Sequence, residues 1–143
     1  MLALEVVTPE RCLFKINCIS VTLPGKSGEF QVLKGHTAML AGLRTGILSF
    51  NPNGSDKTLK NLPFSLNNFR LMITNGFVEI SDDSVIVLCD FAVLPNEVDA
   101  ISSRKQVIRL KKKLEKLNKG LDKEFCQIEA ELEQTVVKLL LVS

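Results

Sequence analysis

Proline and glycine divide this chain of 143 residues into two unequal parts. All five prolines and seven of the eight glycines lie before residue 96, and only Gly120 follows it. Proline and glycine punctuate turns, whereas a long run without them permits a helix. The sequence therefore predicts an α+β protein with a β domain over residues 1–95 and a helical part over residues 96–143.

The first part carries the alternating apolar and polar residues of half-buried strands. The alternation runs through residues 12–16 and continues in the opposite phase through residues 19–23. Because the phase changes at Asn17-Cys18, we expect a turn or a β-bulge there. Short strands separated by frequent turns predict an antiparallel β-sandwich or flattened barrel.

Three later segments extend this β pattern. Residues 69–73 alternate, and Asn75-Gly76 follows them. That dipeptide predicts a tight hairpin turn, because both residues tolerate a positive φ. The return strand covers residues 77–80, and residues 81–84, Ser-Asp-Asp-Ser, make a second turn. Residues 85–89 are apolar at every position, as in a strand buried between two layers.

The second part predicts an antiparallel pair of amphipathic helices. Gly120 suits the position that ends the first helix, and Asp122 suits the N-cap of the second. Because only two or three residues connect the helices, they pack as a hairpin. Their apolar stripes consist of Val107, Leu110, Leu114 and Leu117 in the first helix, and of Phe125, Ile128, Leu132, Val136 and Leu139 in the second.

The two predicted helices carry opposite charges. Residues 104–119 hold eight basic side chains and one acidic side chain, whereas residues 122–138 hold five acidic and two basic ones. Surface ion pairs contribute about 0–1 kcal/mol each, so they do not lock the hairpin. A basic face lies opposite the apolar stripe of the first helix and consists of Lys105, Arg109, Lys112, Lys116 and Lys119. This face either binds an acidic partner or only keeps the helix soluble.

No catalytic arrangement of side chains can be recognised. His36 is the only histidine, so a Ser-His or Cys-His pair would have to use it, and a loop histidine that orients its own turn is the simpler interpretation. The four cysteines have no paired spacing that would indicate a zinc site. Residues 24–28 lack the glycine spacing of a phosphate-binding loop. We therefore expect no enzyme activity, no cofactor and no metal.

Neither a secretory signal nor a membrane-spanning segment is expected. The N-terminus lacks a basic region followed by an apolar core, and the longest apolar stretches fall far below the roughly 20 residues that a spanning helix needs. The compartment is therefore expected to be reducing, with all four cysteines as free thiols. Cys89, in the doubly apolar segment, should be the most protected thiol.

Several segments together resemble the epsilon subunit of F-type ATP synthases. Residues 23–40 carry its Pro-Gly, Gly-Glu-hydrophobic and Gly-His steps, and residues 43–48 fit its Leu-x-x-Gly-x-Leu pattern. Residues 75–80 and 85–90 look like its Gly-Gly-Phe-x-Glu-Val hairpin and its Val-x-Val-Leu-Ala-Asp strand, and residues 4–10 are typical of its start. The similarity extends over the whole chain, including the two helices.

This resemblance implies a non-catalytic subunit of the central stalk, which couples proton flow to ATP synthesis. Its β domain would bind the gamma subunit and the membrane rotor ring, with Glu29 and His36 exposed at one end of the sandwich. The residues implied for ring contact are Glu29, Gly35, His36 and Arg44. The extended hairpin would bring its basic face to an acidic segment of the catalytic beta subunit and inhibit ATP hydrolysis.

The same resemblance places the chain at the membrane periphery. The location would be the cytoplasmic face of the plasma membrane in a bacterium, or the inner membrane in an organelle. Family members that bind ATP carry a hydrophobic-Asp-x-x-Arg motif at the first helix. Here Asp99 is followed by Arg104 as the first arginine, which lies about 200° further round the helix than the motif requires. We therefore expect weak ATP binding or none.

Two other functions remain as alternatives. A free-standing adaptor would bind peptides along a sheet edge and would be a stable monomer without a stalk partner. A small nucleic-acid-binding protein would use the lysine-rich first helix, and its affinity would fall steeply with salt. Tyrosine and tryptophan, on which bases stack, are absent from the chain, and the net charge is only +2.

Overall fold

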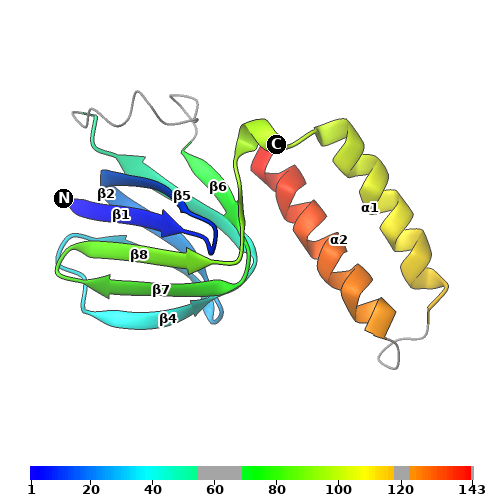
Figure 1. Cartoon of the computed structure of the whole chain (residues 1–143), viewed down its shortest axis with the longest axis horizontal. Coiled ribbons are helices and arrows are strands. Elements are labelled where there is room, and N and C mark those ends of the chain that lie inside the picture. Colours follow the sequence, from blue (N-terminus) through cyan, green and yellow to red (C-terminus); the bar gives the residue numbers. More distant parts are fainter. Residues whose placement is uncertain (55–68, 118–122, 143) are drawn as a thin grey trace.

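The computed structural model describes residues 1–54, 69–117 and 123–142, which form a β domain and a pair of helices (Figure 1). The strands are β1 (Leu2–Val7), β2 (Cys12–Gly25), β3 (Gly28–Leu33), β4 (Met39–Leu43), β5 (Gly46–Pro52), β6 (Arg70–Ile73), β7 (Gly76–Ser81), β8 (Ser84–Cys89) and β9 (Ala92–Val93). A short 3-10 helix, η2 (Pro95–Glu97), leads to α1 (Ala100–Glu115) and α2 (Lys123–Val142). The predicted β-sandwich followed by two helices is confirmed.

The strands form one continuous sheet that folds over into two layers. The sheet order is β1-β8-β7-β4-β2-β5-β6-β9, with β3 paired to β2. β2 belongs to both layers: its first half pairs with β1 and its second half with β3 and β5. The register of β2 against β5 shifts between Cys18 and Ser20, so the β-bulge expected near Asn17-Cys18 is confirmed. Among the described strands, β1 and β8 form a parallel pair in an otherwise antiparallel sheet.

The core lies between the two layers. Alternate residues of β1 point inward, so Leu2, Leu4 and Val6 are completely buried. The rings of Phe14 and Phe50 pack 5.5 Å apart between their centroids. The dominant contribution to stability is the removal of such side chains from water, at roughly 25 cal/mol per Å² of apolar area.

The outer face of β8 differs from the prediction that this strand is buried between two layers. Val85, Val87 and Cys89 point into the core, but Leu88 is 48% exposed and Ile86 is only half-buried. The apolar residues on both faces were read correctly from the sequence, yet no second layer covers the outer face in the described part of this chain.

The predicted hairpin at Asn75-Gly76 is wrong. β6 pairs with β5 and β9, whereas β7 pairs with β4 and β8, so the chain crosses between layers at this dipeptide. Gly76 does not have a positive φ. Glycine is needed there because a Cβ would lie 1.9 Å from the Leu88 carbonyl oxygen of the neighbouring strand. The second predicted turn is confirmed, since Asp82 and Asp83, with φ of 44° and 59°, connect β7 to β8.

The two helices pack as the expected antiparallel hairpin, with α2 lying between the β domain and α1 (Figure 1). Asp99 caps α1 by accepting hydrogen bonds from the backbone N–H groups of Ile101 and Ser102. The predicted helix ends at Gly120 and Asp122 lie outside the described residues. None of the helices in the described ranges is long and apolar enough to cross a membrane.

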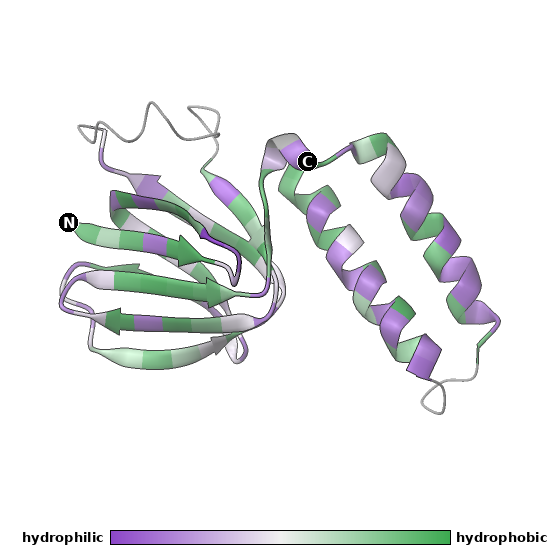
Figure 2. Cartoon of the chain, viewed as in Figure 1, coloured by the Kyte–Doolittle hydropathy of each residue, from purple (hydrophilic) through white to green (hydrophobic). Residues whose placement is uncertain are grey.

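The apolar stripe predicted for α2 is only partly correct. Ile128 is buried, but Val136 is 38% exposed, and Thr135 is buried in its place. The buried Thr135 hydroxyl donates a hydrogen bond to the Glu131 carbonyl at 2.8 Å. The last turns of α2 are rich in hydrophobic residues, and α2 contacts the β domain as well as α1 (Figure 2). A single-stripe prediction assumes one packing partner and fails where a helix has two.

Candidate functional site

The residues expected to touch the rotor ring lie at two separate ends of the β domain. Glu29 stands opposite Pro24 at the start of β3, where the Arg44 N–H donates to the Pro24 carbonyl at 2.9 Å. Gly35 and His36 follow the other end of β3. There the Gly35 N–H donates to the Asp83 carboxylate at 2.8 Å. The expectation that Glu29 and His36 share one end is therefore wrong.

The separation follows from the extended conformation of β3. The four steps from Glu29 to Leu33 along the strand span about 13 Å, and His36 lies beyond them. The pattern Gly-Glu…Gly-His is compact in the sequence, but an intervening strand pulls its two halves apart. Glu29 and His36 therefore lie at opposite ends of β3, which pairs only with β2 among the described strands.

The two ends differ in exposure. Glu29 and Arg44 are exposed, and together with Val137 and Leu140 of α2 they line a cleft of about 210 Å³. His36 is half-buried, and its Nδ1 hydrogen-bonds the Thr37 carbonyl at 2.7 Å. Gly35 has a φ of 83°, which only glycine adopts readily. The geometry at Gly35 and His36 is that of a stabilised turn.

An exposed apolar surface lies over β4, β7 and β8, and sequence reasoning did not assign it. Phe77 is 53% exposed and stands opposite Leu88 in β8, while Leu40 in β4 is 73% exposed. The Lys26 ammonium lies 5.7 Å from the centre of the Phe77 ring. We call Leu40, Phe77 and Leu88 the outer sheet face. The doubly apolar run at residues 85–89 was the signal that could have found it.

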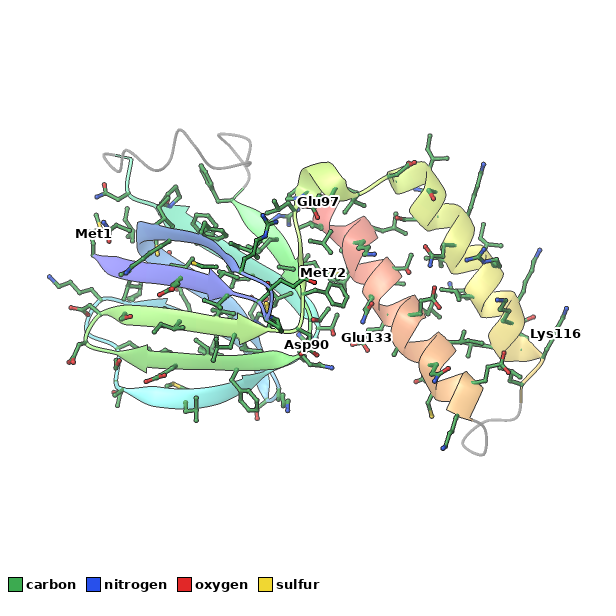
Figure 3. All side chains as sticks on the ribbon, in the orientation of Figure 1. Met1, Met72, Asp90, Glu97, Lys116 and Glu133 are labelled. Atoms are coloured by element: carbon green, nitrogen blue, oxygen red, sulfur yellow. The ribbon has the colours of Figure 1, made fainter. Side chains whose placement is uncertain are left out.

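The basic face of α1 is exposed as far as the structure describes it. Lys105, Arg109, Lys112 and Lys116 are all exposed, and Lys119 lies outside the described residues. Lys105 and Arg109 line a shallow hollow of about 200 Å³ together with Ser102 and Gln106. Figure 3 shows Lys116 at the end of α1 that is far from the β domain. The basic face is thus turned to solvent.

The helices are tied by a polar contact as well as by their apolar stripes. The Gln106 side-chain amide donates to the Glu131 carboxylate at 2.8 Å. Leu110 of α1 and Ile128 of α2 are buried. Exposed glutamates of α2, such as Glu131, do not reach across to cover the whole basic face. Among the described residues, Lys105, Arg109, Lys112 and Lys116 therefore keep positive charge that is available to another molecule.

The four cysteines are free thiols of two kinds. Burial raises the pKa of Cys18 and of Cys89 from the ordinary value of 9.0 to about 11. Partial desolvation and the neighbouring Glu5 carboxylate raise the pKa of the exposed Cys12. The expectation that Cys89 is the most protected is wrong, because Cys18 is 0% exposed and Cys89 5%. Both thiols point into the core.

Metal-binding clusters are not found among the residues at 1–54, 69–117 and 123–142. The features that this fold presents are surfaces: a charged end, an outer sheet face and a basic helix. Such surfaces fit a protein that works by contacting other proteins.

Comparison with known proteins decides the family. The family model described as "ATP synthase, Delta/Epsilon chain, beta-sandwich domain" matches residues 1–95. The chain belongs to this family. The resemblance to epsilon subunits of F-type ATP synthases is therefore confirmed, and with it a non-catalytic subunit of the central stalk in a membrane-associated complex. Neither a free-standing adaptor nor a nucleic-acid-binding protein accounts for this membership.

Individual relatives support the assignment. The ATP synthase epsilon chain of Desulfatibacillum aliphaticivorans is 36% identical over 119 residues, covering 83% of this chain and 77% of that one. "ATP synthase epsilon chain 2" of Syntrophotalea carbinolica is 30% identical over 138 residues, covering 96% and 91%. A chain in the Euglena gracilis mitochondrial ATP synthase has the same fold, with a TM-score of 0.69 at 19% identity over 97% of this chain and 78% of that one.

Proposed function

We propose that this epsilon-type subunit binds the gamma subunit through its outer sheet face, contacts the rotor ring through its Glu29–Arg44 end, and restrains ATP hydrolysis through its basic hairpin. The observation that carries the proposal is the outer sheet face. Leu40, Phe77 and Leu88 are 73%, 53% and 48% exposed on adjacent strands. Exposed apolar side chains that gather on adjacent strands are typical of a surface that a partner covers.

The gamma subunit is the partner that the outer sheet face fits best. A central stalk needs its subunits to turn as one body, which requires a rigid interface with an apolar core. A sheet supplies that rigidity, and Lys26 beside Phe77 supplies a polar rim. The solved Tetrahymena thermophila assembly that shares this fold, with a TM-score of 0.61 at 13% identity over 99% of this chain and 96% of that one, is described as a central stalk and ring.

A pair of matched variants tests this contact. Leu88→Asp places a charge within the outer sheet face, whereas Ile19→Asp places one at an equally exposed site, 48%, on β2. We expect Leu88→Asp to abolish co-elution with purified gamma subunit in size-exclusion chromatography and Ile19→Asp to leave it intact. Equal behaviour of the two variants contradicts the assignment of the face to gamma.

The Glu29–Arg44 end is our candidate for the rotor ring. It presents exposed side chains of both signs next to the exposed turn at residues 26–28, and such charges suit the polar loops of a membrane ring. The resemblance also implies Gly35 and His36 for ring contact. However, the Gly35 N–H is engaged by Asp83 of the β7–β8 turn, and the His36 ring by the neighbouring Thr37 carbonyl. We propose the cytoplasmic face of a bacterial membrane, or the equivalent organellar side, as the location of this subunit.

Cysteine crosslinking distinguishes the two ends. Glu29→Cys and His36→Cys are introduced into a chain whose exposed Cys12 and Cys126 are replaced by serine. In the assembled ATP synthase, a short bifunctional reagent is expected to join position 29 to the ring and to leave position 36 unlinked. A ring crosslink from position 36 alone overturns the proposal.

The basic face is the inhibitory surface for the catalytic beta subunit. Its cations are exposed on α1, and the acidic side chains of α2 leave part of the charge unpaired. Charge complementarity steers such a face to an acidic segment, and the attraction weakens as salt screens it. Deletion of residues after 96 is therefore expected to raise the rate of ATP hydrolysis by the assembled enzyme.

Charge reversal tests the face itself. Lys105→Glu with Arg109→Glu should relieve inhibition, whereas Arg104→Glu with Lys111→Glu makes the same charge change about 130° away around α1. Equal relief by both pairs would show that net charge matters and the face does not. Unchanged hydrolysis after the deletion would refute the regulatory role and leave the roles of the β domain standing.

A further inference from the structure

A side chain of the β domain contacts the last turn of the hairpin. The guanidinium of Arg70, at the start of β6, donates from Nη2 to the Leu141 carbonyl at 2.9 Å. The two residues are 71 positions apart, and Leu141 is completely buried where α2 meets the β domain. Figure 1 shows the end of α2 beside η2, at the point where the chain leaves the sheet.

This hydrogen bond satisfies a carbonyl at the C-terminal end of α2. The last four carbonyls of an α-helix have no intrahelical donors and carry partial negative charge. α1 has Lys112 and Lys113 in its last turn, but α2 has no basic residue there. Arg70 supplies the missing cation from the other domain. The cap of α2 is therefore present only while the hairpin lies against the sheet.

The rest of the docking contact is thin. α2 packs against β5, β6 and η2 near its C-terminal end, while α1 packs chiefly against α2. Val137 and Leu140 leave a cleft of about 210 Å³ against the β domain rather than filling it. Leu141 of α2 and Met72 of β6 are completely buried, so the Arg70 bond acts beside a small apolar contact.

Hydrogen bonds hold the chain to the sheet just before it leaves for the helices. The Thr74 hydroxyl accepts from the Phe91 N–H at 3.0 Å and donates to the Phe91 carbonyl at 3.2 Å. β9 pairs with β6 directly after this point, and α1 begins after its cap at Asp99. A hairpin released at Leu141 would therefore pivot over residues 94–99.

We propose that Arg70 is a latch that sets the equilibrium between a docked and a released hairpin. The inference rests on the proposed regulatory role of the hairpin and names the residue that controls it. With Arg70 in place the α2 cap and the docking contact form together. Without it, the released fraction rises by about tenfold, because a hydrogen bond from a charged donor is lost from a partly buried site.

The native thiols allow the test on the full chain. Cys12 at the start of β2 and Cys126 in α2 are exposed, whereas Cys18 and Cys89 are buried, so spin labels attach to one site in each domain. Double electron–electron resonance then measures the distance between β domain and hairpin. Arg70→Met keeps the aliphatic stem and removes the donor, Arg70→Lys keeps a charged donor, and exposed Lys15→Met is the matched control.

We expect one narrow distance in the wild type and in Lys15→Met, a second and broader population in Arg70→Met, and partial recovery in Arg70→Lys. An unchanged distance in Arg70→Met, with an unchanged melting curve of the β domain, overturns the latch. Hydrolysis by the assembled enzyme separates the two claims. If Arg70→Met shifts the distance but not the inhibition, the latch stands and the regulatory role fails.

Discussion

Gly76 is the position where a single methyl group should do the most damage to this fold. An added Cβ would lie 1.9 Å from the Leu88 carbonyl oxygen and 2.8 Å from the Cys89 Cα, both of which are backbone atoms of β8. Backbone of a paired strand cannot rotate away as a side chain can. To reach an ordinary contact of 3.4 Å, β7 and β8 must separate by about 1.5 Å at this end.

The cost can be built from two parts. Separation breaks about two ladder hydrogen bonds around the Gly76–Cys89 pair, at about 1 kcal/mol each. Overpacking adds about 1–3 kcal/mol. Gly76→Ala should therefore lower the free energy of unfolding by at least about 3 kcal/mol, a large share of the roughly 5–15 kcal/mol of a typical domain.

Urea unfolding followed by circular dichroism measures this loss. With a slope of about 2 kcal/mol per molar urea, the midpoint should fall by about 1.5 M. Gly54→Ala is the matched control, because a Cβ at Gly54 meets nothing within 4 Å, and its midpoint should move by less than about 0.3 M. Equal midpoints for the two variants would refute the argument that strand spacing requires glycine at position 76.

The thiols, the start of α1 and ATP binding offer further tests. A maleimide at pH 8 should label Cys12 and Cys126 in a fast phase and Cys18 and Cys89 at least 100-fold more slowly, since a pKa of about 11 leaves little thiolate. Cys18 and Cys89 have a higher pKa in the folded chain than in the unfolded chain, so between pH 9 and 11 the unfolded chain loses their protons first. The free energy of unfolding should therefore be highest below pH 9 and fall by about 2 kcal/mol per buried thiol as the pH rises towards 11. Alanine at both buried positions should flatten that part of the stability curve measured by urea unfolding. Asp99→Ala removes the α1 cap and should cost about 1 kcal/mol of helix stability, measured as a loss of helical circular dichroism. For the unmodified chain, calorimetry should detect no micromolar ATP binding.

Local chemistry made much of this fold predictable from the sequence. The absence of proline and the near absence of glycine after residue 96 indicated the helices, because both residues act on the backbone of their own segment. The phase change at Asn17-Cys18 indicated the bulge, and residues 81–84 indicated the turn between β7 and β8. Each of these features depends on neighbours in the chain, which a sequence displays directly.

The candidate sites were less predictable, because they depend on which strands lie side by side. Glu29 and His36 are seven positions apart, but an extended strand sends them to opposite ends. Asn75-Gly76 has the composition of a hairpin turn and instead crosses between layers, where a strand passes within 1.9 Å of the Cβ position. The composition of a segment shows which backbone conformations it can adopt, but the rest of the fold decides which of them it does adopt.

The sequence by itself determined the two-part architecture, the basic face of the first helix and the family. Only the tertiary structure decided that Arg70 caps α2, since the donor and the acceptor lie 71 residues apart. It also decided that Leu40, Phe77 and Leu88 form one exposed face, because strand register aligns three segments that the chain separates. Strand pairing and helix docking bring distant residues together through the burial of shared apolar surface, and that burial is a property of the whole fold and not of any segment.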